Sequence, residues 1–336
     1  MTSVWQLASR VAAWAPDIAR DLVADAQDTD ENDDARAAEI LGRVFATTST
    51  WDLAREAFQT AATAWESVDE ARATAVRGVA RGLPVVPFAD DDAALEAELE
   101  IVARMLDGET AMPVVRRTIV ELRRSLSPLR VVGQLEAALG LSPAETALII
   151  AAAAPLLVPS FAGLPADRWE ELVASSTLAP RATADRLVKL GAISQTPALI
   201  VSPPIASWLL GRRNLEHPGG VRLSSVPASL ERGDTDAAYR LLVERACVIA
   251  TEPDVLAGGL AEMGRALVAL RPAARSGRSA IVTASIEARL HGGIPLIDLE
   301  SWDGADPQII ADLAPCAVVP PRDSALAAAV QGIVAP

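Results

Sequence analysis

The sequence predicts a mixed fold: an all-α N-terminal region, a small α+β domain and a C-terminal α/β domain with a short parallel sheet. Three observations predict it. Apolar residues recur at helical spacing over residues 1–127, two short β-branched runs follow the helices of the middle part, and strand-like and helix-like stretches alternate near the C-terminus. We expect domains at residues 1–127, 128–211 and 236–336, with a linker at 212–235.

The composition is that of a globular protein with an acidic surface. Of the 336 residues, 51% are hydrophobic, which provides enough apolar surface for the cores of two or three domains. The net charge is −14, whereas nucleic acids and anionic membranes are bound by basic surfaces. We therefore expect a protein partner, and neither a nucleic acid nor a membrane.

The N-terminal region is predicted to be helical throughout. Apolar residues from Val4 to Trp14 lie at helical spacing, and Pro16 suits the first turn of a second helix. Asp90 and its two acidic neighbours favour the N-terminus of a later helix. Further helical patterns cover residues 35–46, 51–65, 68–82 and 113–126.

One acidic stretch in this region has the spacing of a calcium site. The ligand positions of an EF-hand loop are matched by Asp28, Asp30, Asn32 and Glu39. The sixth place is Asp33, however, where the sharp turn of such a loop requires glycine. The other interpretation is an acidic linker in which Asp33 or Asp34 caps the next helix.

The predicted helix at 113–126 carries four arginines that lie largely off its apolar face. They are Arg116, Arg117, Arg123 and Arg124. Such an arginine face is either solvated or paired with the acidic helices of the same chain. Binding of nucleic acid is the alternative interpretation, and the negative net charge disfavours it.

Residues 146–164 are uncharged and long enough to cross a bilayer. Pro155 and Pro159 divide them, so we expect a buried core helix instead. Residues 1–6 carry no basic segment and no long apolar run of the kind found in a secretory signal, so we expect a cytoplasmic protein.

The middle part of the chain predicts a winged helix. Ser142, Pro143 and Glu145 form a compact helix start, and a later helix ends at Gly191. Two β-branched runs around Pro197 then form a short hairpin, and helices followed by such a hairpin constitute a winged helix.

A winged helix also suggests DNA binding, with residues 181–190 as the reading helix. Arg181, Arg186 and Lys189 could contact phosphates, but Asp185 lies among them and base-reading side chains are scarce. A protein contact is the favoured interpretation of this helix.

The C-terminal part contains two cysteines in strand-like runs and consecutive βαβ patterns. We expect a parallel sheet with right-handed crossovers. Cys247 and Cys316 lack the spacing of a zinc site, and we expect both thiols to be buried and inert. His217 and His291 are isolated in the sequence, and we place His217 in a surface loop.

Residues 266–299 have the order strand, loop, helix, strand, in which a phosphate-binding P-loop is built. On the pattern G-x-x-x-x-G-K-[ST], Pro272 takes the first glycine, Gly277 the second, Arg278 the lysine and Ser279 the hydroxyl. Proline has no N–H and a fixed φ, and a guanidinium is larger than an ammonium and prefers forked contacts. We expect the fold of the loop without its full chemistry.

The middle and C-terminal parts resemble the winged-helix domain found ahead of the ATPase core in a group of bacterial AAA+ proteins. The stretches that carry the resemblance are 141–155, 181–191 and 205–211. In that group an α/β segment with a weakened P-loop follows, often with a competent ATPase domain after it. The resemblance covers roughly residues 129–320. It maps the phosphate-binding residues of the family onto Gly277, Arg278 and Ser279 only.

An ATPase also needs an acidic residue at a strand end to hold Mg²⁺. Asp298 ends a hydrophobic run, but a single helix separates it from Ser279, whereas the metal-binding acid of an AAA+ core arrives after a further βα passage. We therefore favour a strand-end cap over a metal contact for Asp298.

These observations favour a non-catalytic recognition or assembly portion, or a companion, of a bacterial AAA+ machine. We expect no enzyme activity unless segments outside this chain complete an ATPase, and no cofactor. The first alternative is a regulatory module in which Arg275, Arg278 and Ser279 still hold the phosphates of ATP without hydrolysis. The second is a winged-helix DNA regulator.

Overall fold

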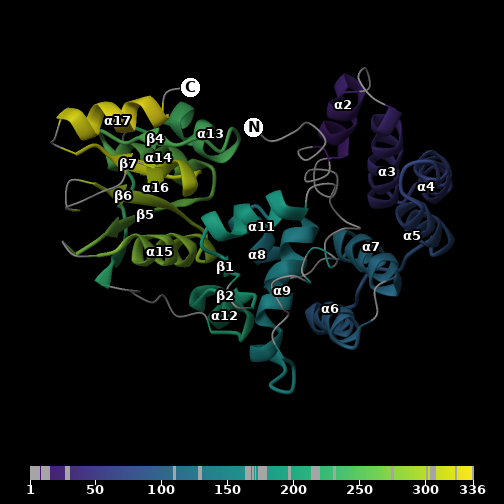
Figure 1. Ribbon diagram of the computed structural model, residues 1–336. Helices are drawn as coiled ribbons and strands as arrows, with labels where there is room; N and C mark the ends of the chain where they lie inside the picture. Colours follow the sequence, from purple (N-terminus) through teal and green to yellow (C-terminus); the bar gives the residue numbers. More distant parts are fainter. Residues whose placement is uncertain are drawn as a thin grey trace. The chain divides into compact units, whose positions relative to one another are not determined.

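The computed structural model divides into two compact units, which we call the N-terminal and the C-terminal unit (Figure 1). The first comprises Met1–Val188 and Ile193–Val201, and the second Lys189–Ala192 and Ser202–Pro336. The structure describes residues 8, 16–26, 31–108, 111–127, 131–162, 168, 170, 172, 180–195, 198–212, 220–229, 232–273, 276–299, 302, 308–321 and 324–334. The predicted mixed class is confirmed, with helices in the first unit and a mainly parallel sheet in the second.

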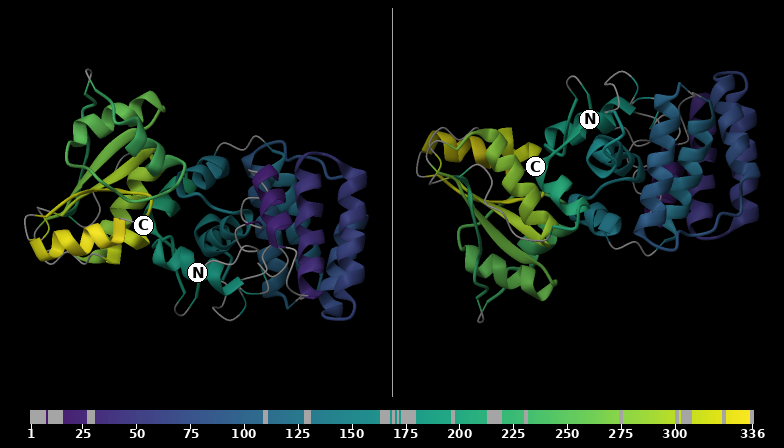
Figure 2. Two further views of the ribbon diagram at one scale, coloured as in Figure 1. Left: turned by 90° about the horizontal axis from the view of Figure 1, so that it is seen from above. Right: turned by 90° about the horizontal axis from the view of Figure 1, so that it is seen from below.

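The described part of the N-terminal unit is built from helices and one small hairpin. Its helices are α2 (Pro16–Ala26), α3 (Glu31–Thr47), α4 (Trp51–Trp65), α5 (Glu70–Arg81), α6 (Asp91–Leu106), α7 (Ala111–Ser125), α8 (Val131–Leu139), α9 (Pro143–Leu157) and α11 (Pro180–Lys189), which ends at the unit boundary. Both views of Figure 2 show the purple and blue helices α2 to α7 side by side. The expected helix from Val4 to Trp14 lies almost entirely outside the described residues.

Side-chain caps fix where several of these helices begin. Asp69 and Asp90 stand in extended conformation before α5 and α6, and each carboxylate accepts a hydrogen bond from a backbone N–H of the first turn. Before α9, the backbone N–H of Glu145 donates to Ser142 Oγ, and the N–H of Ser142 donates to the Glu145 carboxylate. The predicted start of this helix is therefore confirmed as a reciprocal capping box.

Helix α9 is buried on every side. Each residue from Ala144 to Ala154 is inaccessible or nearly so, and α6 and α7 pack against it. An apolar helix of this kind belongs in the interior of a unit, so the predicted core helix is confirmed for residues 146–154, whereas Leu156 is 51% exposed and the helix ends at Leu157. No single helix among the described residues is long and apolar enough to span a membrane. Helices α8 and α9 meet that test only as a pair, across a bend of 117°.

The predicted hairpin is present as strands β1 (Ile193–Ser194) and β2 (Ile200–Val201). They pair antiparallel, with Ile193 opposite Val201. Helix α9 packs against β2, so the hairpin joins the helices of the N-terminal unit. The following helix α12 (Pro203–Leu209) belongs to the C-terminal unit instead.

The C-terminal unit contains a five-stranded sheet in the order β3-β5-β6-β7-β4. The strands are β3 (Arg222–Ser225), β4 (Val248–Ile249), β5 (Ala266–Arg271), β6 (Gly293–Asp298) and β7 (Ala317–Val319). All pairs are parallel except β3 with β5. The parallel strands were predicted, whereas β3 lies inside the segment expected to be a linker, so that prediction is wrong for residues 222–225.

Helices cover both faces of this sheet. They are α13 (Thr235–Leu242), α14 (Pro253–Glu262), α15 (Arg278–Leu290), α16 (Gln308–Asp312) and α17 (Ser324–Val334). Helices α13 and α14 share a core with one face, and α15, α16 and α17 with the other. Leu267 and Ala269 of β5 point to the first face and Val268 and Leu270 to the second, as strand alternation requires.

Helix α12 packs against α15 within the C-terminal unit. The indole of Trp208 meets the ring of His291 edge to face, with the ring centroids 6.0 Å apart. The expected domain boundary at residue 211 therefore differs from the observed division, which separates α12 from the hairpin just before it.

The segment between β3 and α13 is held against the start of α14. The N–H groups of Ser229 and Asp234 donate to the carbonyl oxygens of Asp254 and Val255. Two glycines make this approach feasible: a Cβ on Gly258 would lie 2.6 Å from the carbonyl oxygen of Arg232, and a Cβ on Gly259 would lie 2.3 Å from that of Asp234. Backbone therefore packs on backbone at this crossing.

Candidate functional site at the β5–α15 loop

The loop between β5 and α15 has the predicted strand, loop, helix and strand order. Strand β5 ends at Arg271, α15 begins at Arg278, and β6 follows beside β5 in parallel register. Pro272 is buried directly after the strand, and Gly277 precedes the helix in extended conformation. The backbone frame of the predicted site is thus in place.

Two of the predicted phosphate-binding side chains, Arg278 and Ser279, lie at the start of α15. The guanidinium of Arg278 forms an ion pair with Asp312, at the end of α16. Ser279 is exposed, and its carbonyl oxygen accepts a hydrogen bond from Thr283 Oγ1. Gly277 is the N-cap residue of α15, and as a glycine it has no side chain that could accept a hydrogen bond from the first turn. Arg275 lies outside the described residues.

The loop backbone is engaged by the protein itself. The N–H of Ser276 donates to the carbonyl oxygen of Ala273, and the carbonyl oxygen of Ser276 accepts a hydrogen bond of 3.0 Å from Trp302 Nε1. A P-loop binds phosphate through N–H groups that point inward and carry no other partner. At Ser276 that donor is already used.

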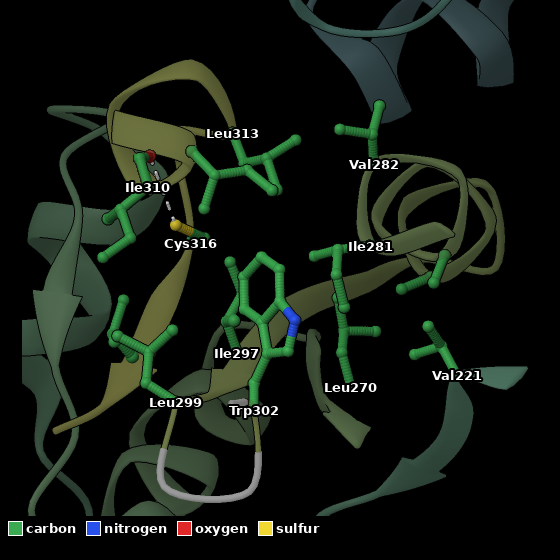
Figure 3. Close-up of a cluster of buried hydrophobic side chains, with 14 of the residues drawn as sticks. Val221, Leu270, Ile281, Val282, Ile297, Leu299, Trp302, Ile310, Leu313 and Cys316 are labelled. Atoms are coloured by element: carbon green, nitrogen blue, oxygen red, sulfur yellow. Dashed lines mark hydrogen bonds between the residues drawn. The ribbon is translucent and has the colours of Figure 1, made fainter. Parts of the chain in front are cut away.

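Trp302 anchors the loop to the core beneath it. Its indole lies among Leu270, Ile281 and Ile297, between α15 and the sheet, and is 6% exposed (Figure 3). On another side the segment before β3 approaches the loop, since a Cβ on Gly220 would lie 3.9 Å from Ser276 Oγ. The space under the loop is therefore filled by apolar side chains of the same unit.

Asp298 ends β6 as predicted, where it pairs in register with Val319 of β7. Asp298 is half-buried and interacts with other groups of the chain. The structure thus places this carboxylate on the strand next to β5, one βα step after the loop.

The calcium spacing does not correspond to a loop in the structure. Helix α3 begins at Glu31, so Asn32 and Glu39 lie within a continuous helix, and Asp28 and Asp30 lie outside the described residues. The alternative interpretation, in which Asp33 or Asp34 caps the helix, is also wrong, because both lie inside α3. Glu39 is buried and accepts two hydrogen bonds from Arg72.

The proposed DNA-reading helix α11 uses one of its cations internally. Arg186 pairs with the buried carboxylate of Glu145 and donates to the carbonyl oxygens of Leu139 and Gly140. It therefore ties α11 to the turn between α8 and α9. Lys189 and Asp185 are exposed, and the side chain of Arg181 is not described.

The structure also contains a chain of buried ion pairs that crosses the N-terminal unit. We call it the charge ladder. Its members are Glu39, Arg43, Arg72, Glu98, Arg117, Glu121, Arg124 and Glu136. At its centre Arg117 is fully buried, pairs with Glu98 and contacts Glu121 at 3.0 Å. The sequence interpretation that the arginines of residues 113–126 pair with acidic helices is confirmed for Arg117.

Opposite charges lower the pKa of two carboxylates of the charge ladder, Glu98 and Glu39. Burial alone would raise the pKa of Glu98, but Arg117 and Arg124 outweigh burial and hold the pKa below its ordinary value of 4.5. Burial is likewise outweighed by Arg72 and Arg43 at Glu39, whose pKa is also lowered. The spacing of apolar residues in the sequence already indicated that Glu98 is buried. It lies on the apolar face of α6, four residues after Ala94 and three before Ile101.

Comparison of the chain with protein-family models, with curated proteins and with solved structures finds no match. Among the residues that the structure describes, no three His, Cys, Asp or Glu side chains are grouped so that they could hold a metal ion together. Conclusions about function therefore rest on the geometry of this chain.

Proposed function

We propose that the chain is a non-catalytic recognition or assembly module that acts through protein contacts in the cytoplasm. In this proposal α8, α9, α11 and the β1–β2 hairpin form a winged helix, and the C-terminal unit is a P-loop-like fold that no longer serves a nucleotide. The partner expected from the sequence resemblance is an AAA+ ATPase, of which this chain would be a portion or a companion.

The observation that carries the proposal is the internal engagement of the β5–α15 loop. Arg278 pairs with Asp312, and both backbone polar groups of Ser276 are bonded within the unit. The ion pair by itself is a weak obstacle, because the Arg278 side chain is 44% exposed and exposed pairs contribute about 0–1 kcal/mol. The buried side chains of Pro272 and Trp302 are the larger obstacle to phosphate binding, since phosphate would have to displace groups that belong to the core.

Isothermal titration with ATP and Mg²⁺ tests the loop directly. We expect no binding by the unaltered chain, by Arg278→Ala or by Asp312→Asn, the last of which releases Arg278 from its partner. The matched control is Arg265→Ala, an exposed arginine of the same unit that lies before β5. Micromolar affinity that is lost in Arg278→Ala but kept in Arg265→Ala would instead establish the nucleotide-binding alternative.

The proposal also requires a surface that binds another protein, and α13 carries a candidate. Tyr239 and Val243 stand four residues apart, and are 49% and 59% exposed. Large apolar side chains exposed one turn apart on the same helix side favour a contact with another protein. We expect affinity capture from native extract to retain an ATPase with the unaltered chain and to lose it with Tyr239→Ser/Val243→Ser.

The control for this capture is Met263→Ser, which alters an exposed apolar residue elsewhere in the same unit. Absence of any ATPase from the captured proteins would contradict the AAA+ partner. Retention by the Tyr239→Ser/Val243→Ser variant would place the contact on another surface. Gel retardation of DNA at low salt, lost in Lys189→Ala, would favour the regulator alternative.

A further inference from the structure

The two cysteines of the chain lie next to each other in the sheet of the C-terminal unit. Cys247 directly precedes β4 and Cys316 directly precedes β7. These strands are parallel neighbours in which Val248 stands opposite Ala317, so the two cysteines also stand opposite each other. Their sulfur atoms are 3.6 Å apart. The two cysteines are 69 positions apart in the sequence, so the strand order alone brings them together.

The surroundings of the pair distinguish the two thiols. Cys316 is fully buried and Cys247 is 8% exposed. Both sulfur atoms face the carbonyl oxygen of Ile310, at 3.2 Å from Cys247 and 3.7 Å from Cys316. Figure 3 shows the contact of Cys316. Strand β4 is only two residues long and lies at the edge of the sheet, so a local opening there exposes Cys247 first.

A buried arginine adds positive charge to this cluster. Arg289 donates to the carbonyl oxygens of Leu313 and Pro315, just before Cys316. The hydrogen bond with Cys316 lowers the pKa of Cys247 against the effect of burial, and Arg289 lowers it further. The same hydrogen bond and burial raise the pKa of Cys316. The first proton to leave the pair is therefore that of Cys247.

We propose that Cys247 and Cys316 are an oxidant-responsive dithiol, in which Cys247 reacts with a hydroperoxide and Cys316 then closes a disulfide between β4 and β7. Neighbouring positions on paired strands lie within the range of Cα separations that a disulfide spans. The sulfur atoms need only move together, and the backbone partners are already in register.

The oxidation takes place in two steps. The Cys247 thiolate attacks the distal oxygen of the hydroperoxide, the O–O bond breaks, and Cys247 becomes a sulfenic acid. The leaving alkoxide or hydroxide takes up the proton that the Cys247 thiol had released and departs as an alcohol or water. The sulfur of Cys316 then attacks the Cys247 sulfur, an S–S bond forms, and the sulfenic hydroxyl leaves as water with the Cys316 proton. The two thiols lose two electrons in total, and the peroxide gains them.

The disulfide would attach the edge strand covalently to the sheet. In the reduced chain β4 is held by the hydrogen bonds from the N–H of Val248 to Cys316 and from the N–H of Ala250 to Val318. A covalent bond one residue before β4 restricts the opening of both. Oxidation therefore converts a two-residue edge strand into a permanent part of the sheet.

Peptide mapping by mass spectrometry under non-reducing conditions tests the proposal on the full chain. After limited hydrogen peroxide and alkylation, we expect one linked peptide pair joining Cys247 to Cys316 within one chain, with the chain lighter by two hydrogens and restored by dithiothreitol. Hydrogen exchange at Val248 to Ala250 should become slower in the oxidised chain. If both thiols remain open to alkylation after unfolding, or form only intermolecular links, the proposal is wrong.

Single variants separate the two roles. In Cys316→Ser we expect a sulfenic acid at Cys247 that dimedone traps, because no thiol remains to resolve it. In Cys247→Ser we expect Cys316 to stay reduced. The circular dichroism spectrum of each variant verifies its fold, and the peptide map of the unaltered chain decides the matter independently if a variant does not fold. A Cys316 that reacts first would overturn the assignment of roles.

Discussion

Gly191 ends the turn after α11 with a φ of +71°, a left-handed conformation that glycine adopts without steric penalty. The sequence predicted this residue as the stop of the helix. The structure adds a second requirement that the sequence did not show, because a Cβ at this position would lie 2.0 Å from Cγ1 of Val282 in α15. Conformation and packing thus both demand glycine here.

We expect Gly191→Ala to lower the free energy of unfolding of the C-terminal unit by roughly 2–4 kcal/mol, adding a left-handed penalty to an overpacking penalty. Gly264→Ala is the matched control. Gly264 has the same φ of +71° and no atom within 4 Å of its added Cβ, so it should show only the penalty of about 1–2 kcal/mol for the backbone. Urea denaturation of both variants measures the difference, and equal losses would disprove the clash with Val282.

At the scale of elements, α6 and α7 are joined by charge as well as by apolar packing. Glu98 of α6 pairs with both Arg117 and Arg124 of α7, and all three side chains are at most 2% exposed. Removing one partner of such a pair leaves a charge in the interior without compensation, which costs more than the intact pair contributes. The charge ladder should therefore be sensitive to single substitutions.

We expect Arg117→Met to destabilise the N-terminal unit by about 3–5 kcal/mol, since Glu98 and Glu121 lose a buried partner. The neighbouring Arg116→Met changes the net charge equally, but Arg116 pairs at the surface with Glu100 and should cost about 1 kcal/mol or less. Hydrogen exchange of α6 and α7 peptides measures both effects. Similar losses in the two variants would show that the buried pairs do not stabilise the unit.

How far the sequence predicts these elements depends on whether their causes are local. Asp90, Ser142 and Gly191 act on their own helix ends, so their roles could be predicted from neighbours in the chain. The polar four-residue strand β3 exists only because β5 lies beside it, and the pairing of Cys247 with Cys316 depends on the strand order. The partner of Arg278 was missed for the same reason, since the five-residue α16 was not predicted.

At the scale of the whole molecule, the lowered carboxylate pKa values belong to the N-terminal unit, at Glu39, Glu98 and Glu100 among the described residues. A carboxylate whose pKa is lower in the folded than in the unfolded chain stabilises the fold above its unfolded pKa. That stability is lost as the pH falls through the folded pKa. The N-terminal unit should therefore lose stability as the pH falls below about 4.5.

We expect acid to unfold the N-terminal unit before the C-terminal unit. Incubation between about pH 5 and pH 2, followed by a brief amide-exchange pulse at one fixed pH, should show loss of protection in α3, α6 and α7 while β5 and β6 stay protected. Glu98→Gln removes one of the titrating groups and should flatten the pH dependence of the N-terminal unit. Simultaneous loss of protection in both units would contradict this assignment.

The crossing of Ser229 and residues 232–234 over Gly258 and Gly259 has a practical consequence for anyone who divides this chain for expression. A fragment that starts at the first residue of α13 would omit β3 and the backbone that covers the two glycines. Such a fragment would leave β5 as an edge strand with unpaired backbone groups, which promotes aggregation. A cut placed ahead of Gly220 keeps the whole five-stranded sheet in one piece.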